Sequence, residues 1–320
     1  MRRIPTLVLC MAAFGFAAAT HAQSYPNRPI RIIVPNTPGG ATDTFARVMG
    51  EKLGDALKQP VVVENRGGAQ GNIGTAYGAK AAPDGYTLTV AFTSAFALNP
   101  FMYPNPGFDP LKDFTAVGLG VTFPLVAVTG HSASFNTLKE LEKLAKQEPN
   151  SLSYASTSSQ TEMMAVLFQM QTRTEMLYVP YKGATTAIID LERGEVDLMF
   201  ASIPSVTSFI SAGRLKALAV SGDKRVEALP DVMTAKEAGY PDFNITGWYG
   251  LVAPAGTPND IVQKLNAEIN KIVAMPDVQK TFNNSGLEAT GATVDEFSAL
   301  IRKDYQRWGE VVEASKKMKK

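Results

Sequence analysis

Two glycine-bearing turns near the start of this chain constrain its fold more than any other feature. The first turn, residues 35–43, follows the β-branched run 30–34, and the second, residues 67–74, follows the run 61–64. Each turn leads into a segment with the spacing of a helix. A strand that turns through glycines into a helix leaves free main-chain N–H groups at the positive end of the helix dipole. The sequence therefore predicts two adjacent helix ends that can hold a small anion without lysine or arginine.

The first 22 residues have the organisation of a secretory signal peptide. Arg2 and Arg3 form the charged start, residues 7–19 are apolar but too short to cross a bilayer, and Thr20-His21-Ala22 is a small-x-small cleavage sequence. Cys10 lies inside this segment. No later stretch of the sequence approaches the length of a membrane span, so we expect the mature protein to be exported and soluble.

The composition of the remaining chain argues against several classes of function. After residue 22 the sequence has no cysteine and one histidine, His131, which leaves no thiol nucleophile, disulfide framework or Cys/His zinc cluster. We therefore expect neither a metal nor a cofactor. Removing Arg2 and Arg3 from the 31 basic residues leaves 29 against 30 acidic ones. This balance, with a basic run only at 316–320, argues against nucleic acid as a partner.

Strand-like and helix-like segments alternate along the chain, whose length favours two domains. Apolar strand patterns occur at 30–34, 61–64 and 86–92, with helical patterns after the first two. This βαβαβ order predicts a parallel sheet covered by helices on both faces. A loop rich in proline and aromatic residues follows at 99–114. The later predicted strands are 124–128, 152–155, 177–179, 196–200, 215–220 and 247–252, and the helices among them are 138–146, 161–170 and 184–191.

The last section of the chain is predicted to be helical. One helix is expected to start at Thr257-Pro258, with a capping side chain and a proline at the first helical position. A second is expected to start at a capping box formed by Thr293 and Glu296. Amphipathic helices of this size need a domain face to lie against, and we place them on the first domain. The first lobe then comprises residues 24–124 and 225–320, and the second lobe comprises residues 125–224.

The motifs of exported enzymes are incomplete in this chain. Residues 130–134 have the serine of a nucleophile elbow but lack its second glycine, and Ser221 with Lys224 has no companion motif of the serine–lysine hydrolases. The glycines of the second turn are not spaced as a dinucleotide fingerprint. We therefore predict that the protein is not an enzyme. A hydrolase that uses Ser132 and His131 stays open as an alternative.

Polar side chains follow several of the predicted strands. Thr93 and Ser94 end one strand, a serine- and threonine-rich run at 156–161 follows another, and residues 178–183 follow a third. Open parallel sheets place their ligand contacts outside the carboxyl ends of the strands, so we expect these clusters to face one crevice. Each run taken alone is more typical of capping and turns.

A set of motifs in this order resembles one known family. The motifs are residues 25–35, Pro38-Gly39-Gly40 with Asp43, residues 63–66 with 71–74, and residues 83–88, 178–183, 213–220 and 253–258. The set resembles the extracytoplasmic solute receptors of tripartite tricarboxylate transporters, also called the Bug family. The resemblance spans essentially the whole mature chain, with departures from the relatives' pattern after Ser156 and near Ala201.

The resemblance implies an α/β protein with the two-lobed periplasmic binding protein fold, type II-like, in which each lobe is a mostly parallel sheet flanked by helices. It implies a periplasmic protein that captures a small organic carboxylate, a di- or tricarboxylate or an aromatic acid, between its lobes. The implied partners are the membrane permease subunits of a tripartite transporter, and we expect a monomer. A periplasmic receptor that signals to a sensor kinase is the alternative.

The resemblance also implies which residues form the site. The two glycine-bearing loops would hold the ligand carboxylate, directly or through waters, and the other strand ends would complete the cleft. The residues implied are Thr37, Pro38, Gly39, Gly40, Asp43, Gln70, Gly71, Asn72, Ile73, Thr93, Ser94, Ser156, Ser158, Ser159, Tyr181, Lys182 and Ala201. Asp43 has the wrong charge to contact a carboxylate, so we expect it to accept main-chain N–H bonds and to orient its loop.

Four phenylalanines also lie near predicted strand ends, at positions 92, 96, 123 and 200. Core or hinge packing is the more common role of such residues. A cleft lined for an aromatic or otherwise apolar carboxylate is the second interpretation.

Overall fold

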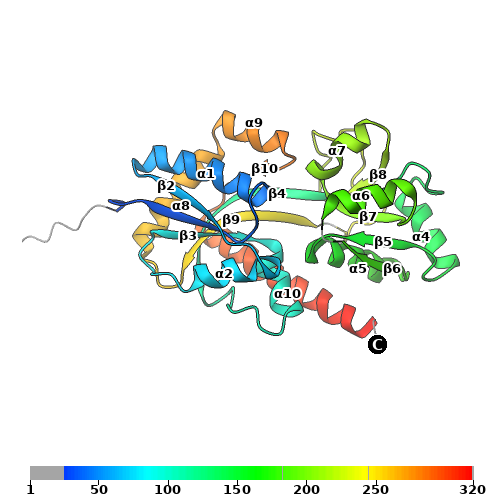
Figure 1. Cartoon of the computed structure of the whole chain (residues 1–320), viewed down its shortest axis with the longest axis horizontal. Helices are drawn as coiled ribbons and strands as arrows, with labels where there is room; N and C mark the ends of the chain where they lie inside the picture. The colour runs from blue at the N-terminus through cyan, green and yellow to red at the C-terminus, as the bar shows by residue number, and fades with distance from the viewer. Residues whose placement is uncertain (1–24, 182, 244, 319–320) are drawn as a thin grey trace, which may run out of the picture.

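Two groups of strands and helices, joined by β4 and β9, make up the structure (Figure 1). The computed structural model describes residues 25–181, 183–243 and 245–318. The predicted signal peptide at 1–22 and Lys182 lie outside these residues. The first sheet holds β1 (Ile30–Val34), β2 (Val61–Asn65), β3 (Thr87–Phe92), β9 (Thr246–Pro254) and β10 (Glu288–Ala289). The second sheet holds β5 (Ser153–Ser156), β6 (Leu177–Pro180), β7 (Leu198–Ser202) and β8 (Leu215–Val220). Strand β4 (Phe114–Gly130) belongs to both sheets.

Strand β4 changes partners along its length. Its first part pairs with β9 as far as Pro124, which lies opposite Thr246, and from Leu125 onward it pairs with β7 and then also β8. These pairs are antiparallel, whereas β1 is parallel to β2 and β3, and β5 is parallel to β6 and β7. Each sheet is therefore mixed, which corrects the prediction of mostly parallel sheets. The reason is that β4 leads out of the first sheet while β9 returns beside it in the opposite direction.

Helices cover both faces of the first sheet. On one face lie α1 (Ala41–Leu57), α8 (Asn259–Val273) and α9 (Pro276–Asn284), and on the other lie α2 (Asn72–Ala79) and α10 (Val294–Met318). Helix α1 packs through residues three or four apart, which share one face of a helix. Phe45, Met49 and Leu53 are fully buried there as predicted, and Val48 is half-buried.

The second sheet has its own helical cover. The helices are α4 (Leu138–Gln147), α5 (Ser159–Thr172), α6 (Ala184–Arg193) and α7 (Ile203–Ser211). Tyr240, Phe243 and Ile245 are buried in the same core as α4 and α5, although they follow β8 by some distance in the chain. The end of α10 reaches this core too, where Trp308 is buried. Helix α10 therefore packs against both groups (Figure 1).

Several elements differ from the sequence prediction. A π-helical turn, η2 (Ser94–Leu98), follows β3, and a short helix, α3 (Asn99–Met102), occupies the start of the predicted loop. Strand β4 begins at Phe114 rather than at 124. Helices α7 and α9 were not predicted. Helix α8 begins at Asn259, and Thr257 donates its hydroxyl to the Pro254 carbonyl instead of capping the helix. The predicted capping box at Thr293 is confirmed, with both of its main-chain to side-chain bonds present.

Candidate functional site

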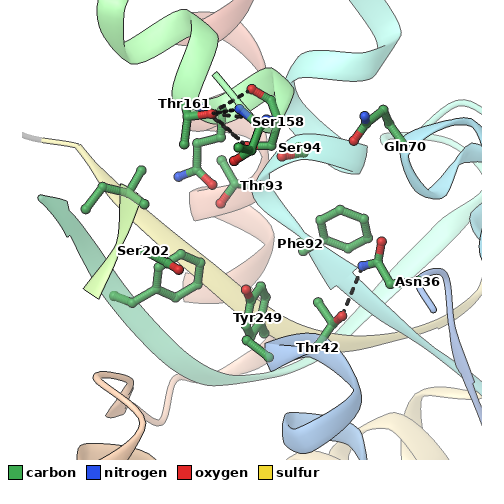
Figure 2. A pocket seen from close by; sticks show the side chains of 15 residues that line it. Asn36, Thr42, Gln70, Phe92, Thr93, Ser94, Ser158, Thr161, Ser202 and Tyr249 are labelled. Atoms are coloured by element: carbon green, nitrogen blue, oxygen red, sulfur yellow. Dashed lines mark hydrogen bonds between the residues drawn. The ribbon is translucent and has the colours of Figure 1, made fainter. Parts of the chain in front are cut away.

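A cavity of about 210 Å³ lies where segments of the two sheets meet. Its walls come from the starts of α1 and α5, the 3₁₀ turn η1 (Ala69–Gly71), the ends of β3 and β7, and the middle of β4 and β9. The lining residues are Asn36, Ala41, Thr42, Gln70, Phe92, Thr93, Ser94, Phe123, Leu125, Thr157, Ser158, Gln160, Thr161, Ser202 and Tyr249. Figure 2 shows Asn36 and Thr42 on one side of this space, with Ser158 and Thr161 on the other.

Helix α1 begins at the cavity without a side-chain cap. Its N-cap residue is Gly40, which has extended backbone and no side chain to offer. The next two residues, Ala41 and Thr42, line the cavity, and the Thr42 hydroxyl accepts a hydrogen bond from Asn36 Nδ2 at 3.0 Å. An uncapped helix start leaves main-chain N–H donors available at the positive end of the dipole. This wall can therefore bind an anion without any charged side chain.

Asp43 holds the loop in front of α1. Its Oδ2 accepts a bond from the Gly39 amide at 2.9 Å and another from Arg47 Nε at 2.9 Å, and its Oδ1 accepts from Asn65 Nδ2 at 2.9 Å. The expected main-chain bond to this carboxylate is thus present. Burial acts to raise the pKa of Asp43, but the bonds from Arg47, Gly39 and Asn65 outweigh it and leave that pKa below its usual value. The carboxylate stays ionised and paired at neutral pH.

The second loop places Gln70 at the cavity through an unusual backbone. Gln70 has a φ of 55°, in the left-handed region that residues other than glycine rarely adopt. Asn99, which is fully buried, donates to the Gln70 carbonyl at 3.0 Å and to Asn72 Oδ1 at 2.7 Å. These two bonds hold the strained turn in place.

Glycine is required twice in this loop. Gly71 has a φ of 93°, and a Cβ there would lie 2.6 Å from Cζ of Phe92. A Cβ on Gly74 would overlap the Arg66 carbonyl and would lie 2.7 Å from Cα of Pro35. Both glycines therefore allow the second loop to pack closely against the first loop and the end of β3.

Aromatic rings form the middle of the cavity. Phe92 on β3 lies opposite Tyr249 on β9 in the register of the sheet, and the rings of Tyr249 and Phe123 are 4.7 Å apart. Of the four phenylalanines weighed from the sequence, Phe92 and Phe123 line the cavity, whereas Phe96 and Phe200 are fully buried in the cores. Core packing is therefore confirmed for Phe96 and Phe200, whereas a role of Phe92 and Phe123 in binding an apolar ligand stays a prediction.

The wall opposite α1 is the start of α5. The Ser158 hydroxyl accepts from the Thr161 amide at 3.3 Å, and the Thr161 hydroxyl accepts from the amides of Thr157 and Ser158. Gln160 lies between them; it is 7% exposed and lines the cavity, and its terminal amide nitrogen has no hydrogen-bond partner among the described residues. This wall is polar, and the start of α5 within it is capped by the side chains of Ser158 and Thr161.

The residues implied by the resemblance are distributed unevenly around this cavity. Four of them line it: Gln70, Thr93, Ser94 and Ser158. The exposed Thr37, Pro38, Gly39 and Gly40 lead directly into the lining residues Ala41 and Thr42, and Asp43 anchors them. Of the second loop, Gly71 and Asn72 are buried beside Gln70, and Ile73 is largely exposed.

Of the remaining implied residues, the four that the structure describes do not line the cavity. Ser156 and Ser159 are buried and hydrogen-bonded, to Thr161 and to Asn99 respectively. The Tyr181 hydroxyl donates to Asp190, and Ala201 is buried in a core of the second sheet. Lys182 lies outside the described residues.

Several lining residues escaped the sequence prediction. Asn36, Ala41 and Thr42 belong to the first glycine-bearing turn, so the turn itself was a signal for them. Thr157, Gln160 and Thr161 were not named as site residues, but they belong to the polar run 156–161, which was expected to face the crevice. Ser202 is the last residue of β7, so it is a polar residue at a strand end like the predicted ones. Leu125 and Tyr249 had no such signal, because pairing between strands far apart in the chain places them. Leu125 is placed by the pairing of β4 with β7, and Tyr249 by the pairing of β9 with β3 and β4.

The described residues also bear on metal binding and on the alternative hydrolase. No group of three or more His, Cys, Asp or Glu side chains that could hold a metal ion occurs among them. His131 and Ser132 are exposed beyond the end of β4 and do not line the cavity. Across the described part of the chain, no helix has the length and apolar character needed to cross a membrane.

Comparison with known proteins identifies the family. A family model described as "Tripartite tricarboxylate transporter family receptor" matches residues 45–316. Protein BugT of Bordetella pertussis is 37% identical over 314 residues, which cover 97% of this chain and 96% of that protein. The chain belongs to the tripartite tricarboxylate transporter receptor family. The resemblance stated from the sequence is confirmed, and the family description does not favour a receptor for a sensor kinase.

Solved structures related to this receptor include two with small acids. R. palustris Rpa4515 with adipate is 31% identical, with a TM-score of 0.80, over 90% of this receptor and 97% of that chain. MatC from Rhodopseudomonas palustris with bound malate is 30% identical, with a TM-score of 0.78, over 90% of this receptor and 100% of that chain. This receptor thus has the two-lobed binding-protein fold, and it is a member of a family of periplasmic solute receptors.

Proposed function

We propose that this receptor binds a small organic carboxylate in the cavity between its sheets, with the carboxylate at the start of α1. The uncapped helix start carries the proposal, because Ala41 and Thr42 present main-chain donors at the positive end of a helix of 17 residues. The relatives with adipate and with malate support a carboxylate as the ligand class. Thr37–Gly40 and Gln70–Asn72 complete this end of the site.

The two lobes close on the ligand in this proposal. The predicted boundary at 124/125 coincides with the change in partner of β4. For the return boundary, predicted at 224/225, the burial of Tyr240, Phe243 and Ile245 with the second sheet supports a position near 245 instead. The cavity then has one wall in each lobe, so a ligand that contacts both walls favours the closed arrangement.

We also propose that the receptor delivers its ligand to a membrane permease, which the description of the family model as a transporter receptor supports. In this proposal the receptor acts as a monomer in the periplasm, after residues 1–22 direct its export and are removed. Its role is to bind and release its ligand unchanged. Incubation with the bound acid, followed by mass spectrometry of the acid, tests the absence of an enzymatic reaction.

A thermal-shift screen with small mono-, di- and tricarboxylates tests the binding proposal, because a ligand that binds only the folded state raises the melting temperature. Each acid is paired with its uncharged amide as a control ligand. We expect at least one acid to raise the melting temperature with increasing concentration and its amide to leave it unchanged. A screen in which no carboxylate raises the melting temperature would contradict the proposal.

A proline substitution tests the position of the carboxylate. Ala41 is the first residue of α1, where proline fits a helix but removes one main-chain N–H donor. The preceding Gly40 has the extended backbone that proline requires before it. Ala41→Pro should keep the fold and weaken acid binding about tenfold or more, the value of a hydrogen bond to a charged group. Asn259→Pro, at the first residue of α8 away from the cavity, is the matched control and should bind normally.

A further inference from the structure

We infer that a basic groove at the outer edge of the first sheet is the surface on which this receptor docks to an acidic, extended segment of its membrane permease. The inference rests on the function proposed above and names the surface that the permease contacts. The groove has a volume of about 540 Å³, and no described residue lines both it and the ligand cavity. Its lining residues are Arg28, Pro29, Arg31, Val62, Tyr77, Lys80, Ala81, Ala82, Asp84, Tyr86 and Thr87.

The floor of the groove is a row of side chains across three neighbouring strands. In the register of the sheet, Arg31 on β1 lies beside Val62 on β2 and beside Thr87 on β3. Arg31 is exposed, whereas the other four residues of β1 are buried, and Val62 is 51% exposed. Helix α2 ends at Ala79, so Lys80 lies at the side of the groove. No helix of the described chain therefore fully covers this part of the sheet.

The groove has an excess of positive charge. Arg28, Arg31 and Lys80 line it, and the one carboxylate among its lining residues is Asp84. Asp84 pairs with Arg28 at 2.6 Å, Arg31 reaches Glu64 only at 3.8 Å, and the exposed Lys80 has no ion pair within the described ranges. Ion pairs between exposed side chains add little stability, so a partner can replace them at small cost. Charge complementarity therefore indicates an acidic partner.

Tyrosine and threonine side chains hold the arginines of the groove in place. Cζ of Arg28 lies 4.1 Å from the centroid of the Tyr86 ring. Arg31 donates to the Thr87 hydroxyl at 3.2 Å and to the Tyr77 hydroxyl at 3.5 Å. A guanidinium that stacks on a ring still presents N–H donors along its edge, and it loses less freedom when a partner binds. Tyrosine and arginine are also the residues that contribute most at the centres of protein interfaces.

The open edge of β2 indicates a protein segment as the partner. Strand β2 is first in the order of the sheet and pairs only with β1 among the described residues, and Figure 1 shows it on the side away from the second sheet. The outer edge of such a strand presents main-chain N–H and C=O groups that an extended segment can pair with. Side chains of that segment on the groove face would lie next to Val62, one strand away from Arg31. A free anion would use the cations of the groove and not this edge.

Two motifs found in the sequence meet at this groove. The motif at 25–35 includes Arg28 and Arg31, and the motif at 83–88 includes Asp84 and Tyr86. No residue of either motif lines the ligand cavity. The proposed ligand site therefore gives these charged and aromatic side chains no role, and the docking surface gives them one.

Photocrosslinking of the full receptor in its host cell tests the surface directly. Val62→p-benzoylphenylalanine and Ala82→p-benzoylphenylalanine each place a photoreactive side chain at an exposed position of the groove. The host carries the cognate permease and is supplied with the acid that raises the melting temperature most. We expect light to join either receptor variant to an integral membrane subunit of the permease, identified by mass spectrometry. Ile189→p-benzoylphenylalanine, at an exposed position of α6, is the matched control and should give no permease adduct.

Neutral variants test the charge of the surface. Arg31→Gln combined with Lys80→Gln should lower the yield of the adduct from the Ala82 probe about fivefold or more, because complementary charge speeds association. Arg193→Gln combined with Lys143→Gln makes the same change at exposed positions of α6 and α4 and should leave the yield unchanged. Neither pair lines the ligand cavity, so both purified variants should keep the melting temperature and the acid affinity of the wild type.

Three results would overturn the inference while leaving the proposed binding of an acid intact. The first is the absence of an adduct at both groove positions. The second is an adduct with a second copy of this chain, or with a protein other than the permease. The third is an unchanged yield in the variant that lacks the cations of Arg31 and Lys80. A purified receptor that no carboxylate stabilises would overturn the proposed function itself.

Discussion

Asp43 is an acidic side chain beside the helix start that we propose binds another acid. It is 4% exposed, and its two oxygens accept bonds from a main-chain amide, an arginine and an asparagine. Arg47 lies on the next turn of α1, so the pair adds no net charge to the loop. At the residue scale, this carboxylate therefore serves the site by holding Gly39 and its neighbours in position.

Substitution of Asp43 should separate its hydrogen bonds from its charge. Asp43→Ala removes every bond to the loop and should lower the free energy of unfolding by about 2 kcal/mol and weaken acid binding. Asp43→Asn keeps an acceptor for the Gly39 amide and should have a smaller effect on both. Denaturant unfolding and calorimetric titration measure the two quantities. Full affinity in Asp43→Ala would reject the role of this residue in orienting the loop.

The stability difference between the wild type and Asp43→Asn should also depend on pH. Because the native pKa of Asp43 is lowered, its stabilising contribution is present above the unfolded pKa of about 3.9 and is lost as the pH falls through the lower native pKa. The stability difference between the wild type and Asp43→Asn should therefore be constant from about pH 7 to pH 5 and shrink below about pH 4. A difference that grows on acidification would contradict the pairing.

At the scale of elements, a buried hydrogen bond helps to tie α10 to β9, the strand whose Tyr249 lines the cavity. Trp248 on β9 donates its indole N–H to Asp304 on α10 at 2.7 Å, and both side chains are buried. Tyr249, the neighbour of Trp248, lines the cavity. Burial raises the pKa of Asp304, although the bond from Trp248 acts in the opposite direction. The contact therefore places a carboxyl group in the core, where desolvation disfavours its ionised form.

Asp304→Asn should stabilise the receptor at neutral pH, because the amide oxygen still accepts from Trp248 and the buried charge is gone. The native pKa of Asp304 is raised, so the wild type is at no disadvantage below the unfolded value of about 3.9 and loses stability as the pH rises through the native pKa. Melting temperatures of the two proteins should converge near pH 4 and separate above it. Asp304→Leu, which removes the acceptor, should be destabilised throughout.

At the scale of the whole molecule, few connections link the two groups of strands and helices. The chain leaves the first sheet along β4 at 124/125 and re-enters it at the start of β9, while α10 packs on both cores. The cavity lies beside these connections, with the start of α1 on one side and the start of α5 on the other (Figure 2). This arrangement allows two lobes to rotate about β4 and β9.

Ligand binding should therefore make the receptor more compact. Small-angle X-ray scattering at a saturating concentration of the most stabilising acid should show a smaller radius of gyration than the free receptor. The same measurement with the uncharged amide of that acid serves as the control and should show no change. An unchanged radius with bound acid would mean that the lobes do not close on it.

The sequence alone predicted the features that depend on near neighbours. The strand, glycine turn and helix units around α1 and α2, the capping box at Thr293, and the bond from a main-chain amide to Asp43 all involve residues a few positions apart. Local propensity and hydrogen bonding determine such features. Thr93, Ser94 and Ser158 follow strands and line the cavity, and Gln70, which was implied by the family resemblance, lines it too.

Only the tertiary structure decided how these pieces meet. Strand β9 pairs with both β3 and β4, which brings Tyr249 beside Phe92 and Phe123, and no local pattern encodes that register. Periodicity shows which face of a strand is buried, but the partner of that strand depends on packing between segments far apart in the chain. For the same reason the sequence placed Ala201 in the cleft, whereas packing buries it in a core and leaves the amide nitrogen of Gln160 without a hydrogen-bond partner among the described residues.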